Sequence, residues 1–115
     1  MENVYIKNIP HEEEIVLAQQ VQILEGQIVS KTLAQNKYVS LTLFAFDKDE
    51  EISTHDSIGD AMVTVLEGTG KFTIGGKEHI LNAGETIVMP AKVPHAVFAK
   101  EKFKMLLTVI FPENQ

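Results

Sequence analysis

The chain has four histidines and no cysteine among its 115 residues, so imidazole is the side chain best suited to metal or proton chemistry. Imidazole binds metal ions through either ring nitrogen and exchanges protons near neutral pH. The absence of cysteine excludes disulfide scaffolds, cysteine-based zinc sites, iron–sulfur sites and thiol catalysis. We expect His11 and His79 to be exposed, because each lies among charged residues. His55 and His95 remain, and either one alone is most simply interpreted as structural.

Composition narrows the class of protein. The hydrophobic fraction is 44%, which is typical of one globular domain and excludes a disordered chain. The net charge of −6 argues against a nucleic-acid partner. No apolar run approaches the roughly 18 residues that span a bilayer, and no signal peptide precedes the acidic N-terminal region. We therefore predict no membrane association and a cytoplasmic protein.

The first half of the chain is expected to provide short strands. After an irregular start, residues 21–24 have the composition of a brief strand, and residues 27–34 alternate with a period of two. Asn36-Lys37 is typical of a tight hairpin turn, because asparagine tolerates a left-handed backbone. Residues 38–46 are apolar on both faces, so this strand is expected between two packed layers.

The second half continues the pattern around a Gly75-Gly76 turn, which is a strong hairpin signal. Glycine and proline separate short β-rich runs, and no helix longer than two turns is expected. Such regular short strands are typical of a sandwich or closed barrel. Further strands are predicted at residues 61–66, 71–74, 77–81, 86–89, 96–99 and 103–111.

Two segments of this β-rich region have a familiar spacing. In residues 49–68, His55 lies where a known motif has its first histidine, and Gly68 lies where that motif ends. Asp49, Ser57 and Ala61 stand where the motif has Gly, His and Glu. The segment resembles the first motif of the cupin superfamily, which has the form Gly, five residues, His-x-His, three or four residues, Glu, six residues, Gly.

Residues 84–99 resemble the second motif of the same family. Gly84, Pro90 and His95 match it, whereas Lys92 and Ala99 replace a glycine and an asparagine. Fifteen residues separate the two motifs, about the family's spacing. The resemblance covers roughly residues 38–111. It implies an all-β, jelly-roll (cupin-like) double-stranded β-barrel, here preceded by an N-terminal strand arm.

The resemblance also implies where a metal ion or other ligand would lie. His55 and His95 occupy two of the four family ligand positions, and the other two hold Ser57 and Ala61. Asp60 can replace the missing glutamate only if a bulge at Gly59 turns its side chain inward. We predict no cofactor. The alternative is a divalent transition metal held by His55, His95 and Asp60.

Strand alternation extends the candidate site beyond the histidines. If His55 and His95 point inward, Ser57, Val63, Val65 and Val97 point inward with them, whereas Met62 and Phe98 point outward. Met89 and Met105 are added as pocket candidates, because flexible thioether side chains often line ligand surfaces. The predicted ligand pocket is therefore His55, Ser57, His95, Met89 and Met105.

Binding is favoured over catalysis as the function. The expected protein is a small-molecule binding or sensing barrel with a degenerate metal site and no assignable reaction. One alternative is a metal-dependent dioxygenase or isomerase of a small polar substrate that uses His55 and His95. A second alternative is a structural dimer module. The ligand itself is not identified by the sequence.

The chain is expected to form one structural domain in two parts. Residues 1–37 form an arm with the first strands, packed on a barrel of residues 38–111. Apolar alternation at residues 27–34 would leave an exposed edge, and residues 38–46 would present an outer face to a partner. Family members commonly pair through N-terminal strands, so the resemblance implies a homodimer.

Overall fold

The computed structural model describes residues 4–113, which form nine strands and one short 3₁₀ helix. The elements are η1 (Leu17–Gln20), β1 (Ile28–Gln35), β2 (Val39–Phe46), β3 (Glu51–His55), β4 (Asp60–Glu67), β5 (Thr69–Ile74), β6 (Lys77–Asn82), β7 (Thr86–Met89), β8 (His95–Ala99) and β9 (Phe103–Ile110). No helix within residues 4–113 is long and apolar enough to cross a membrane. The predicted all-β class is confirmed.

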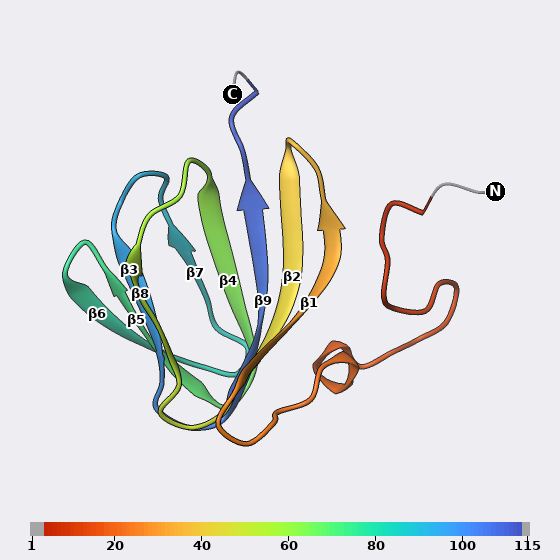
Figure 1. Cartoon of the computed structure of the whole chain (residues 1–115), viewed down its shortest axis with the longest axis horizontal. Coiled ribbons are helices and arrows are strands. Elements are labelled where there is room, and N and C mark those ends of the chain that lie inside the picture. The colour runs from red at the N-terminus through yellow and green to blue at the C-terminus, as the bar shows by residue number, and fades with distance from the viewer. Residues whose placement is uncertain (1–3, 114–115) are drawn as a thin grey trace.

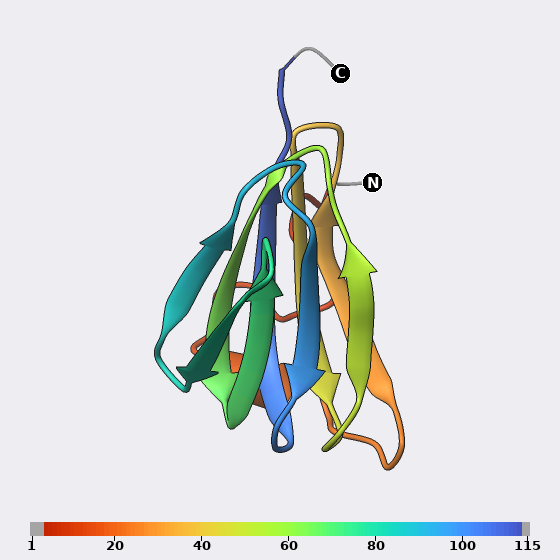
Figure 2. The same cartoon turned by 90° about the vertical axis from the view of Figure 1, so that its left-hand side faces the viewer.

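The strands form two antiparallel sheets that face each other. Sheet A has the order β1-β2-β9-β4-β7, and sheet B has the order β3-β8-β5-β6. The two sheets lie close together at the bottom of Figure 1 and diverge towards its top, and Figure 2 shows sheet B in front of sheet A. This double-stranded β-barrel is the jelly roll that the sequence predicted.

Stacked aromatic rings fill the lower end of the space between the sheets. Phe46 and Phe103 stack with their centroids 4.6 Å apart, and Phe72 meets Phe103 edge-on at 6.0 Å. All three side chains have no exposed surface. Above Phe103, alternate residues of β9 continue along the inner face of sheet A. Because this end of the barrel is tightly packed, a cavity between the sheets is expected towards the other end.

A second apolar cluster lies on the outer face of sheet A. Leu43 and Ala45 are fully buried there beneath the chain's own N-terminal segment, which contributes Val21 at 3% exposure. The buried amine of Lys104 donates a hydrogen bond to the Ala18 carbonyl at 2.7 Å, which ties η1 to β9. The outer face of β2, expected to meet a partner, is therefore covered by this segment over part of its length.

The N-terminal segment differs from the expected strand arm in one respect. Residues 21–24 do not form a strand, and a Gln27 N–H to Leu24 carbonyl bond of 3.1 Å closes a turn there. Instead, the Lys7 N–H donates a 2.7 Å hydrogen bond to the Leu33 carbonyl at the free edge of β1. The Asn8 amide adds a 2.7 Å bond to the Thr32 carbonyl. Residues 7–8 thus occupy this edge, and the side chains of Val21 and Ile23 pack in the outer cluster.

The expected division at residue 37 falls within the turn that joins β1 to β2. β1 pairs with β2 along its length, and its Ile28 packs against the main core. β1 is therefore an integral edge strand of sheet A. The described residues before it, 4–27, lie outside the two sheets.

Candidate functional site

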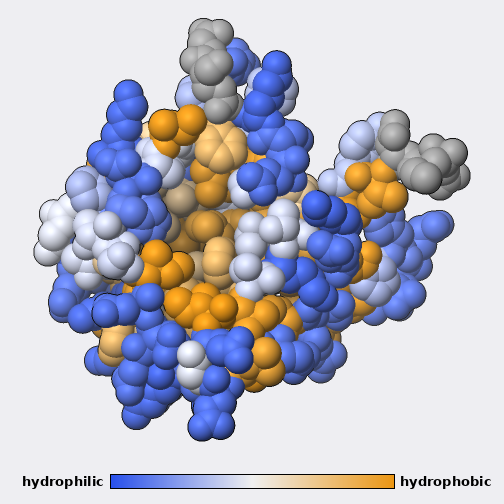
Figure 3. Space-filling model, in the orientation of Figure 1, coloured by the Kyte–Doolittle hydropathy of each residue, from blue (hydrophilic) through white to orange (hydrophobic). Residues whose placement is uncertain are grey.

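A cavity of about 90 Å³ lies between the two sheets, beyond the packed phenylalanines. Figure 3 shows a central hollow with hydrophobic walls in the same region of the molecule. Eight of the eleven lining residues are apolar, and the three polar ones are two histidines and a serine. The lining residues are Phe44, Ile52, His55, Ser57, Ala61, Met89, His95, Val97, Met105, Leu107 and Val109.

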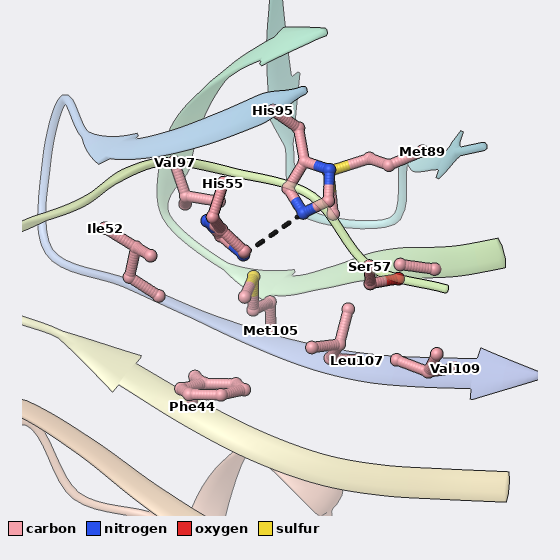
Figure 4. Close-up of a pocket in the computed structure, with 11 residues that line it drawn as sticks. Phe44, Ile52, His55, Ser57, Met89, His95, Val97, Met105, Leu107 and Val109 are labelled. Atoms are coloured by element: carbon pink, nitrogen blue, oxygen red, sulfur yellow. Dashed lines mark hydrogen bonds between the residues drawn. The ribbon is translucent and has the colours of Figure 1, made fainter. Parts of the chain in front are cut away.

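His55 and His95 face each other across neighbouring strands at one side of this pocket (Figure 4). Their Nε2 atoms are 3.2 Å apart, and their rings meet edge-on with centroids 4.4 Å apart. His95 is buried at 4% exposure, whereas His55 is exposed. The imidazole pair is therefore the polar end of an otherwise apolar pocket, and its His55 side is open to solvent.

Backbone carbonyls determine the tautomer of both rings. His55 Nδ1 lies 2.9 Å from the Ser53 carbonyl, and His95 Nδ1 lies 3.1 Å from the Val93 carbonyl. A carbonyl oxygen can only accept, so each Nδ1 carries a hydrogen and donates it. In the neutral rings both Nε2 atoms therefore present lone pairs. Their 3.2 Å contact becomes a hydrogen bond only when one additional proton lies between them.

An irregularity in β3 brings His55 into the pocket. The pairing of β3 with β8 shifts between Ile52 and His55, which are three residues apart. Side chains three apart on a regular strand point to opposite faces, whereas an extra residue restores them to the same face. Both side chains consequently line the pocket. The sequence carries no glycine within this strand to signal such an irregularity.

Asp60 does not join the imidazoles. Its carboxylate accepts a 2.8 Å hydrogen bond from the Ala91 N–H, and its neighbour Ala61 lines the pocket instead. The β4–β9 pairing runs regularly from Asp60 to Val65, so no bulge within these residues turns the Asp60 side chain towards the pocket. A Cβ at position 59 would lie 2.4 Å from the Ile110 carbonyl oxygen, so this glycine permits a close backbone approach.

The other expected pocket residues line the cavity. Met89 and Met105 are 2% and 1% exposed and lie in its wall (Figure 4). Ser57 also lines it, but its hydroxyl donates to the Gly59 carbonyl at 2.7 Å and is thereby engaged. Outside the pocket, His11 is exposed as expected, whereas His79 is half-buried opposite Phe72 on β5.

Several lining residues were not singled out from the sequence. Phe44 lies on a strand that is apolar on both faces, so alternation could not select its inner side. Ile52 follows a charged turn and precedes polar residues, and no periodic signal marks it. Leu107 and Val109 have the same strand parity as Met105, and all three line the pocket. Alternation along this strand is the signal that could have placed Leu107 and Val109 in the pocket.

The polar residues of the pocket do not fit the metal centre that the resemblance implies. A catalytic metal site commonly uses three protein ligands, and the pair supplies two imidazoles. Within residues 4–113, no three His, Cys, Asp or Glu side chains lie together in a way that could hold a metal ion. We therefore derive no chemical step through a metal.

His95 should make folding stability depend on pH. The pKa of His95 is lowered, mainly because burial penalises the charged ring, and the His55 charge adds to this. The Val93 carbonyl and Asp56 act in the opposite direction but do not reverse it. The unfolded chain therefore binds more protons than the folded chain between this lowered pKa and about 6.5. We expect the free energy of unfolding to fall on acidification through this window, as measured by urea denaturation at pH values from about 7.5 to 5.5.

The matched control for this experiment is His11→Gln, which removes an exposed histidine that does not line the pocket. His95→Gln should make the free energy of unfolding depend less on pH. An unfolding free energy that stays constant across the window in the unmodified protein would contradict the lowered pKa of His95.

Comparison with known proteins agrees with this fold. Residues 42–111 match the Cupin domain family. A conserved protein of unknown function from Streptococcus pyogenes is 46% identical, with a TM-score of 0.94 over 96% of this chain and 97% of that one. A cupin superfamily protein from Desulfitobacterium hafniense is 30% identical, with a TM-score of 0.90 over 95% and 100% of the two chains.

A cupin 2 conserved barrel domain protein from Leptotrichia buccalis is 45% identical, with a TM-score of 0.79 over 81% of this chain and 45% of that one. No curated protein matches the chain. The family match covers more than half of the sequence and coincides with the two motifs and the two-sheet barrel. This chain belongs to the cupin superfamily.

Proposed function

We propose that this protein binds a small molecule in the pocket between its two sheets, as a binding or sensing barrel. The observation that carries the proposal is an apolar cavity of about 90 Å³ with two imidazoles at one end. A mostly apolar pocket with a few convergent polar groups is the usual form of a small-molecule site. At the other end of the barrel, the fully buried Phe46, Phe72 and Phe103 pack against one another.

The metal-dependent enzyme is supported less well. It needs a third protein ligand, and the Asp60 carboxylate is bonded to the Ala91 N–H outside the pocket. The engaged Ser57 hydroxyl is a poor ligand, and Ala61 has no ligating atom. Binding without an assigned reaction is therefore the function that this site supports best.

Methionine methyl signals can report occupancy of the pocket. Met89 and Met105 line it, whereas Met62 is 41% exposed on the outer face of sheet A. Apolar cavities of about 150 Å³ bind benzene or xenon, so a cavity open at one end should admit xenon or toluene. We expect these probes to shift the ¹³C-methyl resonances of Met89 and Met105 and to leave Met62 unchanged.

Filling the cavity should abolish this response. Ala61→Leu adds three carbons to the pocket wall, while Ala83→Leu places the same side chain in an exposed turn as the control. We expect the first variant to remain folded and lose the probe shifts, and the second to keep them. Probe shifts that survive Ala61→Leu, or that appear at Met62 alone, would overturn the proposed pocket.

We also infer that two copies of the chain pair. Met62 and Val88 are cross-strand neighbours on β4 and β7, and they are 41% and 49% exposed. Met62 has the same strand parity as Leu66, which packs in the cluster beneath the N-terminal segment. An apolar surface thus continues beyond the part that residues 4–27 cover. A two-fold dimer buries such a patch on both subunits at once.

Light scattering should give twice the 12.8 kDa chain mass for the unmodified protein. Met62→Glu should give the monomer mass, since a carboxylate at the centre of an apolar interface is costly to desolvate. Ile80→Glu introduces the same charge at a residue of β6 that is 47% exposed, and it should stay dimeric. A monomer at micromolar concentration in the unmodified protein would contradict the pairing.

A further inference from the structure

Two loops cross between the sheets at the wide end of the barrel. Residues 56–59 connect β3 of sheet B to β4 of sheet A, and residues 90–94 connect β7 of sheet A to β8 of sheet B. Both loops lie in the upper part of Figure 1, where the sheets diverge. Because each loop is attached to both sheets, contacts between the loops help to set the distance between the sheets at this end.

Two hydrogen bonds join these loops to each other. The Lys92 N–H donates to the Ser57 carbonyl at 2.7 Å, and the Ala91 N–H donates to the Asp60 carboxylate, at the start of β4, at 2.8 Å. We call this pair of bonds the clasp. Asp60 and Lys92 are exposed, so water can replace the partners that they lose when the clasp opens. The clasp can therefore open at a lower cost than hydrogen bonds in the core.

The clasp forms part of the rim of the pocket. Ser57 supplies a clasp acceptor and also lines the pocket, and Ala61, the neighbour of Asp60, lines it as well. Met89 and His95, on either side of the loop that supplies the clasp donors, complete this part of the lining (Figure 4). Parting of the clasp would therefore widen the entrance to the pocket.

The backbone of Lys92 is strained while the clasp is closed. Its φ is +65°, in the left-handed region that a residue with a long side chain rarely adopts. A 3.2 Å bond from the Val93 N–H to the Pro90 carbonyl makes Lys92 the third residue of a β-turn, where a positive φ favours glycine. The Lys92 side chain is exposed, so burial does not account for this conformation. The strain is released when the clasp opens and Lys92 returns to a negative φ.

Resting on the proposed binding function, we propose that the clasp is a gate, which must part for a ring-sized ligand to enter or leave the pocket. Two contributions oppose each other in this gate. The Asp60 carboxylate stabilises the closed state, whereas the positive φ of Lys92 favours the open state. Neither side chain lines the pocket, so both are positioning residues that control access to it.

Substitutions at these two residues should move the gate in opposite directions. Asp60→Ala removes the acceptor of the Ala91 N–H and should raise the open population about 3- to 30-fold. Lys92→Gly removes the penalty of a positive φ, in part offset by the freedom that glycine gains on opening, and should lower that population about 2- to 10-fold. Hydrogen exchange of the amide of residue 92, corrected for its intrinsic rate, should become faster in the first variant and slower in the second.

Toluene kinetics measure whether the gate controls entry. If the clasp has to open first, the rates of toluene binding and release both scale with the open population, and their ratio, the dissociation constant, stays the same. We expect Asp60→Ala to raise both rates and Lys92→Gly to lower both, as measured from the line shape of the Met89 methyl signal during toluene titrations. A residue that merely stabilised the pocket would change the dissociation constant instead.

Matched substitutions at the opposite end of the barrel are the controls. Glu85→Ala removes a carboxylate that accepts a 2.7 Å bond from the Asn82 N–H between β6 and β7. Asp49→Gly relaxes another positive φ, of +71°, between β2 and β3. Neither control should change the toluene rates.

The outcomes separate the gate from the binding function beneath it. Toluene that binds at rates unaffected by Lys92→Gly and Asp60→Ala, or changed in the same direction by both, overturns the gate alone. Lys92→Gly decides the question by itself if Asp60→Ala does not fold, because relief of strain should leave the first variant folded. Toluene that never shifts Met89 and Met105 overturns the pocket, and the gate with it.

Discussion

Gly68→Ala should remove most of the folded protein. Gly68 lies between β4 and β5, where the chain passes from sheet A to sheet B, and its φ is +77°. A Cβ there would lie 2.0 Å from the Lys102 carbonyl oxygen and 2.8 Å from the Phe103 Cα, both of them backbone atoms. The positive φ alone costs about 1–2 kcal/mol, and the overlap raises the expected loss above about 3 kcal/mol.

Gly84→Ala is the matched control for this prediction. Its φ is also positive, at +90°, but an added Cβ would meet no atom within 4 Å. Urea denaturation should therefore show a loss of about 1–2 kcal/mol for Gly84→Ala and a much larger one for Gly68→Ala. Equal losses in the two variants would mean that the backbone at residues 102–103 moves aside easily, contrary to the close approach seen here.

The double substitution Ser57→His and Ala61→Glu should create a metal site. Both positions line the pocket that already contains His55 and His95, so two further ligand side chains would enter the same space. The Nδ1 hydrogens of the existing pair are bonded to carbonyls, which is the usual support for metal-ligating imidazole. We expect the double variant to keep about one equivalent of Co²⁺ or Ni²⁺ through gel filtration.

The unmodified protein should not retain a stoichiometric divalent metal after dialysis against a chelator. Loss of outer hydrogen-bond partners alone costs about 10- to 100-fold in metal affinity, so adding two ligands should raise it by more than about 100-fold. The control, Ser57→Asn with Ala61→Gln, has similar volume and weaker ligands. A folded double variant that binds no metal would show that positions 57 and 61 do not face the two imidazoles. One equivalent of divalent metal retained by the unmodified protein would support the metal-dependent enzyme instead.

Local chemistry was sufficient to predict most of the strands and turns. Asn36 accepts hydrogen bonds from the Tyr38 and Val39 N–H groups at 2.8 and 3.0 Å, which closes the hairpin expected there. Gly75 and Gly76 both have positive φ, as a two-residue hairpin requires. Alternation correctly placed Val63 and Val65 inside, because a half-buried strand shows its period of two in the sequence itself.

Strand pairing between distant segments could not be predicted in the same way. The shift between Ile52 and His55 depends on how β3 meets β8, about forty residues later, and no local residue type signals it. The same shift sets His55 opposite His95. The family resemblance implied a shared site for the two rings, but their tautomers follow from the carbonyls of Ser53 and Val93.

The sequence by itself determined the all-β class, the main turns, the cupin motifs and the two histidines, since each depends on residue type and short spacing. The tertiary structure decided that Asp60 turns to the Ala91 N–H, that residues 21–24 stay outside the sheets, and that the imidazoles meet at 3.2 Å. These outcomes depend on contacts between segments far apart in the chain, where a one-residue change of register reverses the direction of a side chain.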